Sequence, residues 1–304
     1  HSTIDTVHGS FSDRWNGLVY EHSFNHVGID IAPGDPRLKQ GLLARYMAEF
    51  GAMLGGAIDR QGHVFQAGNW VYATLTGDGW LREVAKRVSD NQAERLTPAF
   101  DFTIERAGGW PIINMTMAHH FSGDPYYLNA ARIMVERAID RQDPASGGWL
   151  QWHAGGESGG EQGMGGKAFA VGILSHGLLR YLEQEPNPRP DVERMLIRGA
   201  DFLRDHAWVP GKGFRYISHL KYHAEKPRRG GSEGLNAEVV AFAYEKTRDE
   251  RYREFLNDMI AGQFDKPPSG NGKSFTMQVR QTVYGLDRMR GFGMTAAPGG
   301  TASK

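Results

Sequence analysis

Two kinds of apolar pattern alternate along the chain after about residue 35. In the first kind, apolar side chains recur every three or four residues behind an N-cap signal, which predicts an amphipathic helix. Asp124 followed by Pro125 is the clearest signal, because Asp caps a helix and Pro suits its first turn. The same pattern predicts further amphipathic helices that start near Asp35, Asp78, Pro190 and Asp249.

The second kind of pattern is apolar or small on nearly all sides, and a helix of that type is buried on all sides. It occupies segments 68–76, 110–121, 166–182, 234–246 and, with more charge, 274–289. The sequence thus repeats a buried helix, a tight turn, an amphipathic helix and a long loop rich in Gly and Trp. The predicted long loops are 59–69, 105–110, 143–167 and 208–234.

This repeat predicts an all-α fold, an α/α toroid in which a complete or incomplete ring of five to six helical hairpins spans residues 35–290. A regular solenoid has short loops on both sides, whereas here tight turns lie on one side and long loops on the other. We expect fewer than about one residue in ten in strands, against a usual 20–25%. Residues 1–34 are predicted to be irregular, with at most a short strand, and residues 291–304 to form a tail.

Composition excludes several classes of partner. The 304 residues carry 35 basic and 35 acidic side chains, so no overall charge attracts nucleic acid or an anionic membrane. No apolar run approaches the roughly 18 residues that a membrane span needs. The absence of cysteine excludes disulfides and thiolate metal sites. We expect no cofactor, and we expect a chain that begins at His1 to be processed or excised from a longer protein.

The 40 glycines, 7 tryptophans and 12 histidines are unusual and cluster in the long loops. In a ring of hairpins these loops emerge at one end, which is where a cleft is expected. An aromatic face with polar neighbours suits a sugar ring. The predicted substrate-binding residues are therefore Asn69, Trp70, Trp110, Trp149, Trp152 and His153. In the alternative interpretation, each Trp is part of the core.

Charged residues of two loops complete the predicted binding set. The Gly-rich run 155–166 is no phosphate loop, because no Gly-Lys-Ser/Thr follows it. Its Glu157 and Glu161, with Lys167, are assigned to sugar hydroxyls or proton transfer. The second loop carries basic residues beside Tyr222, which indicates an anionic group such as a uronate in the ligand; its assigned residues are His223, Arg228 and Glu233. For both loops, solvated charges remain the alternative.

Two histidine pairs have the i, i+4 spacing of a metal site, His22 with His26 and His219 with His223. Neither segment has a helical pattern, and no acidic ligand follows in register, so we predict no metal. His176 and Glu238 fall inside buried segments, and we interpret both as satisfied core residues.

Short motifs add a family resemblance. The pair Asn25 and His26 looks like the Asn-His pair of several toroid polysaccharide lyases, and the phrases at 68–70, 76–78 and 122–127 resemble the toroid domain of exo-acting rhamnogalacturonan-lyase-like proteins. The resemblance implies that Asn, His or Arg neutralises the uronate carboxylate. It also implies that Tyr or His removes the C5 proton and protonates the leaving oxygen.

The main functional hypothesis is β-elimination on an acidic polysaccharide or oligosaccharide by a secreted or periplasmic enzyme. Removal of a proton beside a carboxylate needs a positioned base and neutralisation of the developing charge. We assign proton transfer to His26 or His63 with Tyr222, and charge neutralisation to Asn25 and Arg229.

Two alternatives remain open. A glycoside hydrolase would use a carboxyl pair drawn from Glu157, Glu161 and Glu233. A non-catalytic carbohydrate-binding module of a larger protein is the second alternative. A single cleft is predicted in all three cases, lined by Trp70, Trp110, Trp152, His153 and Tyr222.

Overall fold

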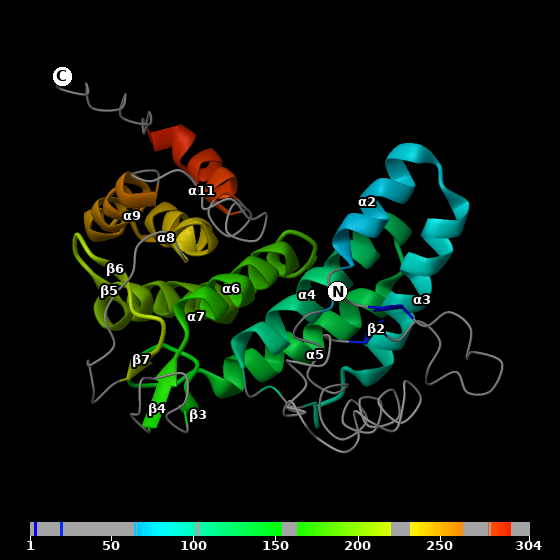
Figure 1. Cartoon of the computed structure of the whole chain (residues 1–304), viewed down its shortest axis with the longest axis horizontal. Helices are drawn as coiled ribbons and strands as arrows, with labels where there is room; N and C mark the ends of the chain where they lie inside the picture. The colour runs from blue at the N-terminus through cyan, green and yellow to red at the C-terminus, as the bar shows by residue number, and fades with distance from the viewer. Residues whose placement is uncertain are drawn as a thin grey trace, which may run out of the picture. The chain divides into compact units, whose positions relative to one another are not determined.

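The computed structural model describes residues 3–4, 19–20, 64, 66–100, 102, 104–153, 163–219, 232–263, 279 and 281–292 (Figure 1). The chain divides into two compact units. One comprises His1–Gln142 and Gly177–Val192, and the other comprises Asp143–His176 and Glu193–Lys304. Helices make up most of the described residues, and the described strands are only two to four residues long.

The first unit contains two helical hairpins. Their helices are α2 (Ala67–Thr76), α3 (Gly79–Arg95), α4 (Glu105–Ser122) and α5 (Pro125–Arg141), and two short strands, β1 (Thr3–Ile4) and β2 (Val19–Tyr20), pair antiparallel. Both hairpin turns have the predicted chemistry. Gly77 and Gly123 each adopt a φ of 72° at a helix C-terminus, a left-handed conformation that glycine adopts at low cost.

Asp78 and Asp124 then cap the helices that follow these two turns. The Asp78 carboxylate accepts a hydrogen bond from the backbone N–H of Leu81 at 2.9 Å. The Asp124 carboxylate accepts one from the N–H of Tyr126 at 2.9 Å. These bonds satisfy donors that the helix itself leaves unpaired.

The second unit contains most of the remaining helices, a three-stranded sheet and a two-stranded sheet. Its helical elements include α7 (Pro190–Phe202), a π-helical turn (Leu203–Ala207), α8 (Glu233–Thr247), α9 (Glu250–Gln263), α11 (Thr282–Met289) and a 3₁₀ turn (Arg290–Phe292). The three-stranded sheet consists of β3 (Gln151–His153), β4 (Gly163–Gly166) and β7 (Ser218–His219), and the two-stranded sheet of β5 (Trp208–Val209) and β6 (Gly213–Phe214). Helix α6 (Ala168–Leu182) belongs in part to each unit.

Most of the predicted elements are confirmed. The segments that are apolar on all sides form α2, α4, α6 and α8, and α4 and α8 are buried along most of their length. Burial on all sides is wrong for α2, in which only Trp70 and Ala73 are buried and Leu75 is exposed. The amphipathic segments form α3, α5, α7 and α9. The helix predicted after Asp35, the C-terminal tail beyond 292 and most of segment 274–281 lie outside the described residues.

The predicted loop 105–110 is wrong, because α4 begins at Glu105. Gly108 and Gly109, which indicated a loop, are helical and buried. A Cβ at Gly108 would collide with the ring of Phe102, so this glycine serves close packing rather than a turn. The last three residues of the predicted loop 59–69 likewise belong to α2. Among the described residues, we find no helix that combines the length and apolar character needed to span a membrane.

Candidate functional site

Helices α6 and α8 lie side by side and parallel within the second unit. Gly172 of α6 contacts the backbone of Leu235, and a Cβ there would also lie 2.8 Å from Oδ1 of Asn236. One turn further along, Nδ1 of His176 lies 2.6 Å from Oε2 of Glu238. Because residue numbers rise together along both helices, their N-terminal ends lie at the same end of the pair.

The three-stranded sheet β3–β4–β7 lies at this end, since β4 leads directly into α6. The antiparallel register places Trp152 opposite Met164, and directly opposite residues share one face of a sheet. Trp152 is 62% exposed and Met164 is 47% exposed. The sheet therefore presents a flat apolar surface to solvent, the Trp152–Met164 platform.

Lys167, between β4 and α6, holds a positive charge beside a second aromatic side chain. Its Nζ lies 5.4 Å from the ring centre of Tyr216, a distance at which a cation is attracted to the ring face. Lys167 is buried, whereas Tyr216 is exposed. Tyr216 also stacks on Phe169, with ring centres 5.6 Å apart and planes 20° apart. These stacked rings fix an ammonium group next to an accessible aromatic face.

Glu233 is the first residue of α8 and is only 1% exposed. Its Oε2 accepts a hydrogen bond from the backbone N–H of Ser232 at 3.0 Å. Glu233 therefore brings a carboxyl group that is shielded from bulk water to the N-terminus of α8. The N-terminal end of the α6–α8 pair thus holds an ammonium group and a carboxyl group.

His176 and Glu238 are buried core residues, as predicted, and they are partners of each other. The other carboxylate oxygen of Glu238 lies 3.7 Å from Nε of Arg288 in α11. The ring of Tyr284 lies 5.3 Å from that of His176. This cluster joins three helices of the second unit through charged and aromatic groups.

Comparison with solved structures identifies the fold class of the chain. No protein-family model and no curated protein matches the chain. Among solved structures, it is similar to an unsaturated glucuronyl hydrolase of Streptococcus agalactiae, at 12% identity and a TM-score of 0.57 over 77% of this chain and 64% of that one. It is also similar to an unsaturated glucuronyl hydrolase specific for heparin, at 15% identity and a TM-score of 0.52 over 70% of this chain and 57% of that one.

A third similar structure is a variant named UGL, whose description includes dGlcA-Glc-Rha-Glc. It is 15% identical, with a TM-score of 0.57 over 79% of this chain and 69% of that one. The fold is an α/α toroid, as predicted. At these identities the likeness carries the fold alone, and the chain spans between 57% and 69% of the length of the three structures. The similarity to rhamnogalacturonan lyases stays a prediction.

The structure places the predicted Trp residues in two settings. Trp70 and Trp110 of the first unit and Trp149 of the second are buried, as the alternative core interpretation expects. Nε1 of Trp70 donates to Oγ of Ser89 at 3.1 Å. Of the four, only Trp152 is exposed.

The polar residues predicted for binding are also placed in part. Asn69 donates from its side-chain amide to Oε1 of Gln66 at 2.9 Å. His153 is buried on β3, with Nε2 3.2 Å from the carbonyl oxygen of Gly165. Among the described residues, the second unit thus contains Trp149, Trp152, His153, Lys167 and Glu233 from the predicted set.

The other predicted site residues lie outside the described residues, so their roles stay predictions. They are Asn25, His26, His63, Glu157, Glu161, Tyr222, His223, Arg228 and Arg229. His22 lies outside as well. Within the described ranges, no three His, Asp or Glu side chains gather in a way that would hold a metal.

Sequence reasoning missed Met164 and Tyr216. Met164 stands between glycines in a run interpreted as part of the loop 143–167, and in the structure it pairs with Trp152 of β3. Tyr216 lies in the predicted loop 208–234, in which the sequence assigns ligand binding to residues from Tyr222 onward.

Proposed function

We propose that this chain is a glycoside hydrolase that acts on uronate-containing oligosaccharides. The carrying observation is its likeness in fold to structures described as unsaturated glucuronyl hydrolases. A fold alone does not determine an activity, so the proposal also needs a site with the right chemistry. The N-terminal end of the α6–α8 pair supports it.

Sugar binding is assigned to the sheet and to Lys167. The Trp152–Met164 platform is exposed and flat, and aromatic faces pack against the C–H groups of a sugar ring. The ammonium of Lys167, beside Tyr216, suits the carboxylate of a uronate. An apolar platform and a cation at the same end of one helix pair favour an acidic sugar over a neutral one.

Proton transfer is assigned to Glu233. Hydrolysis of a glycosidic bond uses a carboxylic acid to protonate the leaving group and a second carboxyl to activate water or attack the sugar. Glu233 is held at the start of α8 and shielded from bulk water. Glu157 and Glu161 are the candidates for the second carboxyl, because their segment connects β3 to β4.

β-Elimination is the second candidate. The specific observation in its favour is the pairing of Lys167 with the accessible phenol of Tyr216. A cation that neutralises the uronate carboxylate, beside a phenol that exchanges a proton, meets the needs of elimination. In this reading Tyr222 and Arg229 keep the roles that the sequence assigns to them.

Product analysis separates these reactions. The full chain is incubated with saturated and with unsaturated uronate oligosaccharides, and the ultraviolet absorbance of the unsaturated uronate is followed beside the release of reducing ends. A hydrolase produces reducing ends and forms no new double bond in saturated substrates. An increase in that absorbance from saturated substrates would instead establish elimination. If no product forms from any substrate, the result favours the non-catalytic carbohydrate-binding module.

Substitution of Glu233 tests its role. Glu233→Gln keeps the size of the side chain and removes the transferable proton, so kcat is expected to fall about 10²–10⁴-fold. Glu254→Gln, at an exposed position on α9, is the matched control and should leave kcat unchanged. Equal rates in the two variants would remove Glu233 from the mechanism.

A further inference from the structure

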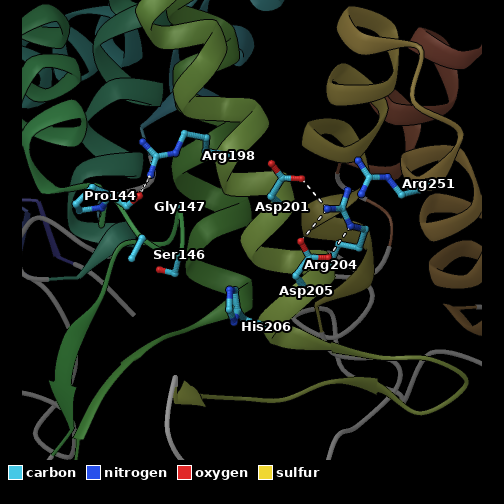
Figure 2. A pocket seen from close by; sticks show the side chains of 10 residues that line it. Pro144, Ser146, Gly147, Arg198, Asp201, Arg204, Asp205, His206 and Arg251 are labelled. Atoms are coloured by element: carbon cyan, nitrogen blue, oxygen red, sulfur yellow. Dashed lines mark hydrogen bonds and ion pairs between the residues drawn. The ribbon is translucent and has the colours of Figure 1, made fainter.

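A polar cavity of about 350 Å³ lies in the second unit (Figure 2). It is lined by the segment 144–147 after α5, by Arg198 and Asp201 of α7, by residues 204–206 of the π-helical turn and by Arg251 of α9. None of the residues assigned above to the candidate functional site lines it. Its volume falls in the range of small-ligand pockets, about 300–1,000 Å³.

Two of the three arginines are already held by carboxylates. Nε and Nη2 of Arg204 donate to the two carboxylate oxygens of Asp205, each at 2.7 Å, and Nη2 also lies 2.9 Å from Asp201. Arg251 donates from Nε and Nη2 to Asp249. These pairs fix both guanidinium groups in the wall and neutralise their charges.

Arg198 differs, because its hydrogen bonds go to backbone carbonyls. Its Nη2 donates to the carbonyl oxygen of Asp143 at 3.0 Å and to that of Pro144 at 2.7 Å. Among the described residues, no carboxylate lies within ion-pair distance of Arg198. The Asp143 carboxylate accepts hydrogen bonds from the backbone N–H and the hydroxyl of Ser146 and interacts with the charge of Arg198 only at longer range. Of the three arginine charges in the pocket, the one at Arg198 is therefore the one without a contacting anion. Its Nε and Nη1 have no hydrogen-bond partner in the described part of the chain.

The wall is built from unusual backbone. The π-helical turn Leu203–Ala207 supplies Arg204, Asp205 and His206. Such turns are rare in proteins overall, and those that occur often lie at functional sites. Opposite it, Gly147 has a φ of 77°, and a Cβ there would lie 2.5 Å from the carbonyl oxygen of Arg198. The segment 144–147 is thus pressed onto α7, which holds the cavity in one geometry.

We infer that this pocket binds a uronate residue of an anionic glycan, at an accessory site separate from the candidate functional site. The uronate carboxylate pairs with the unoccupied edge of Arg198, since guanidinium groups match planar carboxylates. The carboxylates of Asp201 and Asp205 retain lone pairs that accept hydrogen bonds from sugar hydroxyls. The inference rests on the proposed function only for the choice of a uronate as the anion.

Titration calorimetry tests the pocket. The titrated protein is the full chain carrying Trp152→Ala, which weakens the Trp152–Met164 platform. Glucuronate is expected to bind saturably, with glucose and inorganic sulfate at least tenfold weaker. Adding Arg198→Gln should weaken glucuronate at least tenfold, and adding Arg198→Lys should weaken it less. Arg194→Gln, an exposed change on the same helix, is the control and should have no effect.

Three results would overturn the inference. They are glucose binding as tightly as glucuronate, sulfate binding as tightly as glucuronate, and glucuronate binding that Arg198→Gln leaves unchanged. If the Arg198 variants do not fold, Arg251→Gln decides. This exposed change removes a cation from the pocket wall and leaves the Asp249 carboxylate without its partner, so it should weaken glucuronate several-fold and leave glucose unaffected. Binding is measured without turnover, so a chain that binds glucuronate here but cleaves no glycan would contradict the proposed function and not this inference.

Discussion

Within the first unit, Glu185 joins the C-terminal end of α6 to α5 and makes a quantitative prediction possible. It follows α6, its side chain is 3% exposed, and its Oε2 accepts a hydrogen bond from Nη2 of Arg132 in α5 at 2.8 Å. The hydroxyl of Tyr181 donates to the same oxygen at 2.5 Å. Burial raises the pKa of Glu185, but the bonds from Tyr181 and Arg132 outweigh burial and lower the pKa to about 2.

The magnitude follows from linkage between protonation and folding. A pKa lowered from 4.5 to about 2 on folding corresponds to about 3 kcal/mol of stability. Because the folded-state pKa is the lower one, this stability is fully present above the unfolded-state pKa. It is lost as the pH falls through 4.5 toward 2. Glu185→Gln should therefore cost about 3 kcal/mol at neutral pH and much less below about pH 3.

Urea unfolding at neutral pH and at about pH 3 measures both values. Glu183→Gln is the matched control two residues away: Glu183 is 46% exposed and pairs with Arg180 on the surface, so its loss should cost at most about 1 kcal/mol. The reasoning fails if Glu185→Gln costs no more than this control at neutral pH. It also fails if its cost is the same at both pH values.

Three further predictions concern packing, capping and binding. Gly172→Ala should destabilise the protein by more than about 1 kcal/mol in urea unfolding, because the added methyl collides with the backbone of Leu235; an unchanged midpoint would contradict the α6–α8 contact. Asp78→Ala should cost about 1 kcal/mol, since the cap on the N–H of Leu81 is lost, and Asp78→Asn should restore most of it. In a chain that carries Arg198→Gln to remove the accessory site, Trp152→Ala should weaken uronate oligosaccharide binding at least tenfold without changing the unfolding midpoint, because the ring is exposed; equal affinity by calorimetry would exclude the platform.

The hairpins were predictable because their signals are local. Asp78, Asp124 and Asp249 each cap within three residues of themselves, and a local bond leaves a mark in the sequence. The helices that are apolar on all sides were equally predictable from the sequence, since a helix that is buried on every side carries few charged residues. Neither signal depends on which distant segment packs against the helix.

Glycine was ambiguous for a physical reason. Gly77 and Gly123 end helices with a positive φ, whereas Gly108, Gly172 and Gly177 sit inside helices. At those three positions a Cβ would meet a neighbouring ring or backbone. The sequence shows glycine in both cases, but only the second role depends on a contact between segments distant in sequence.

The site was predictable only in part, because its geometry is non-local. Lys167 and Glu233 were chosen as polar residues in loops, and they prove to begin or precede buried helices. Trp152 stands out from the buried tryptophans because antiparallel pairing sets it beside Met164 on an open face. Strand register is not encoded within either strand alone, so exposure at Trp152 did not follow from its own neighbourhood.

The buried residues His176 and Glu238 influence the geometry of the candidate site, because they align α6 with α8. Lys167 and Glu233 lie on separate segments, and their common placement depends on how α6 and α8 are aligned. That alignment is held by the close approach at Gly172 and by the bond between His176 and Glu238, both within the helix pair. One buried hydrogen-bonded pair specifies one register, because sliding either helix by a turn separates His176 from Glu238 in the core, where a lost hydrogen bond is costly. The core polar pair therefore sets which groups meet at the solvent-facing end, and the position of the ammonium relative to the carboxyl is a property of helix packing rather than of the loops around it.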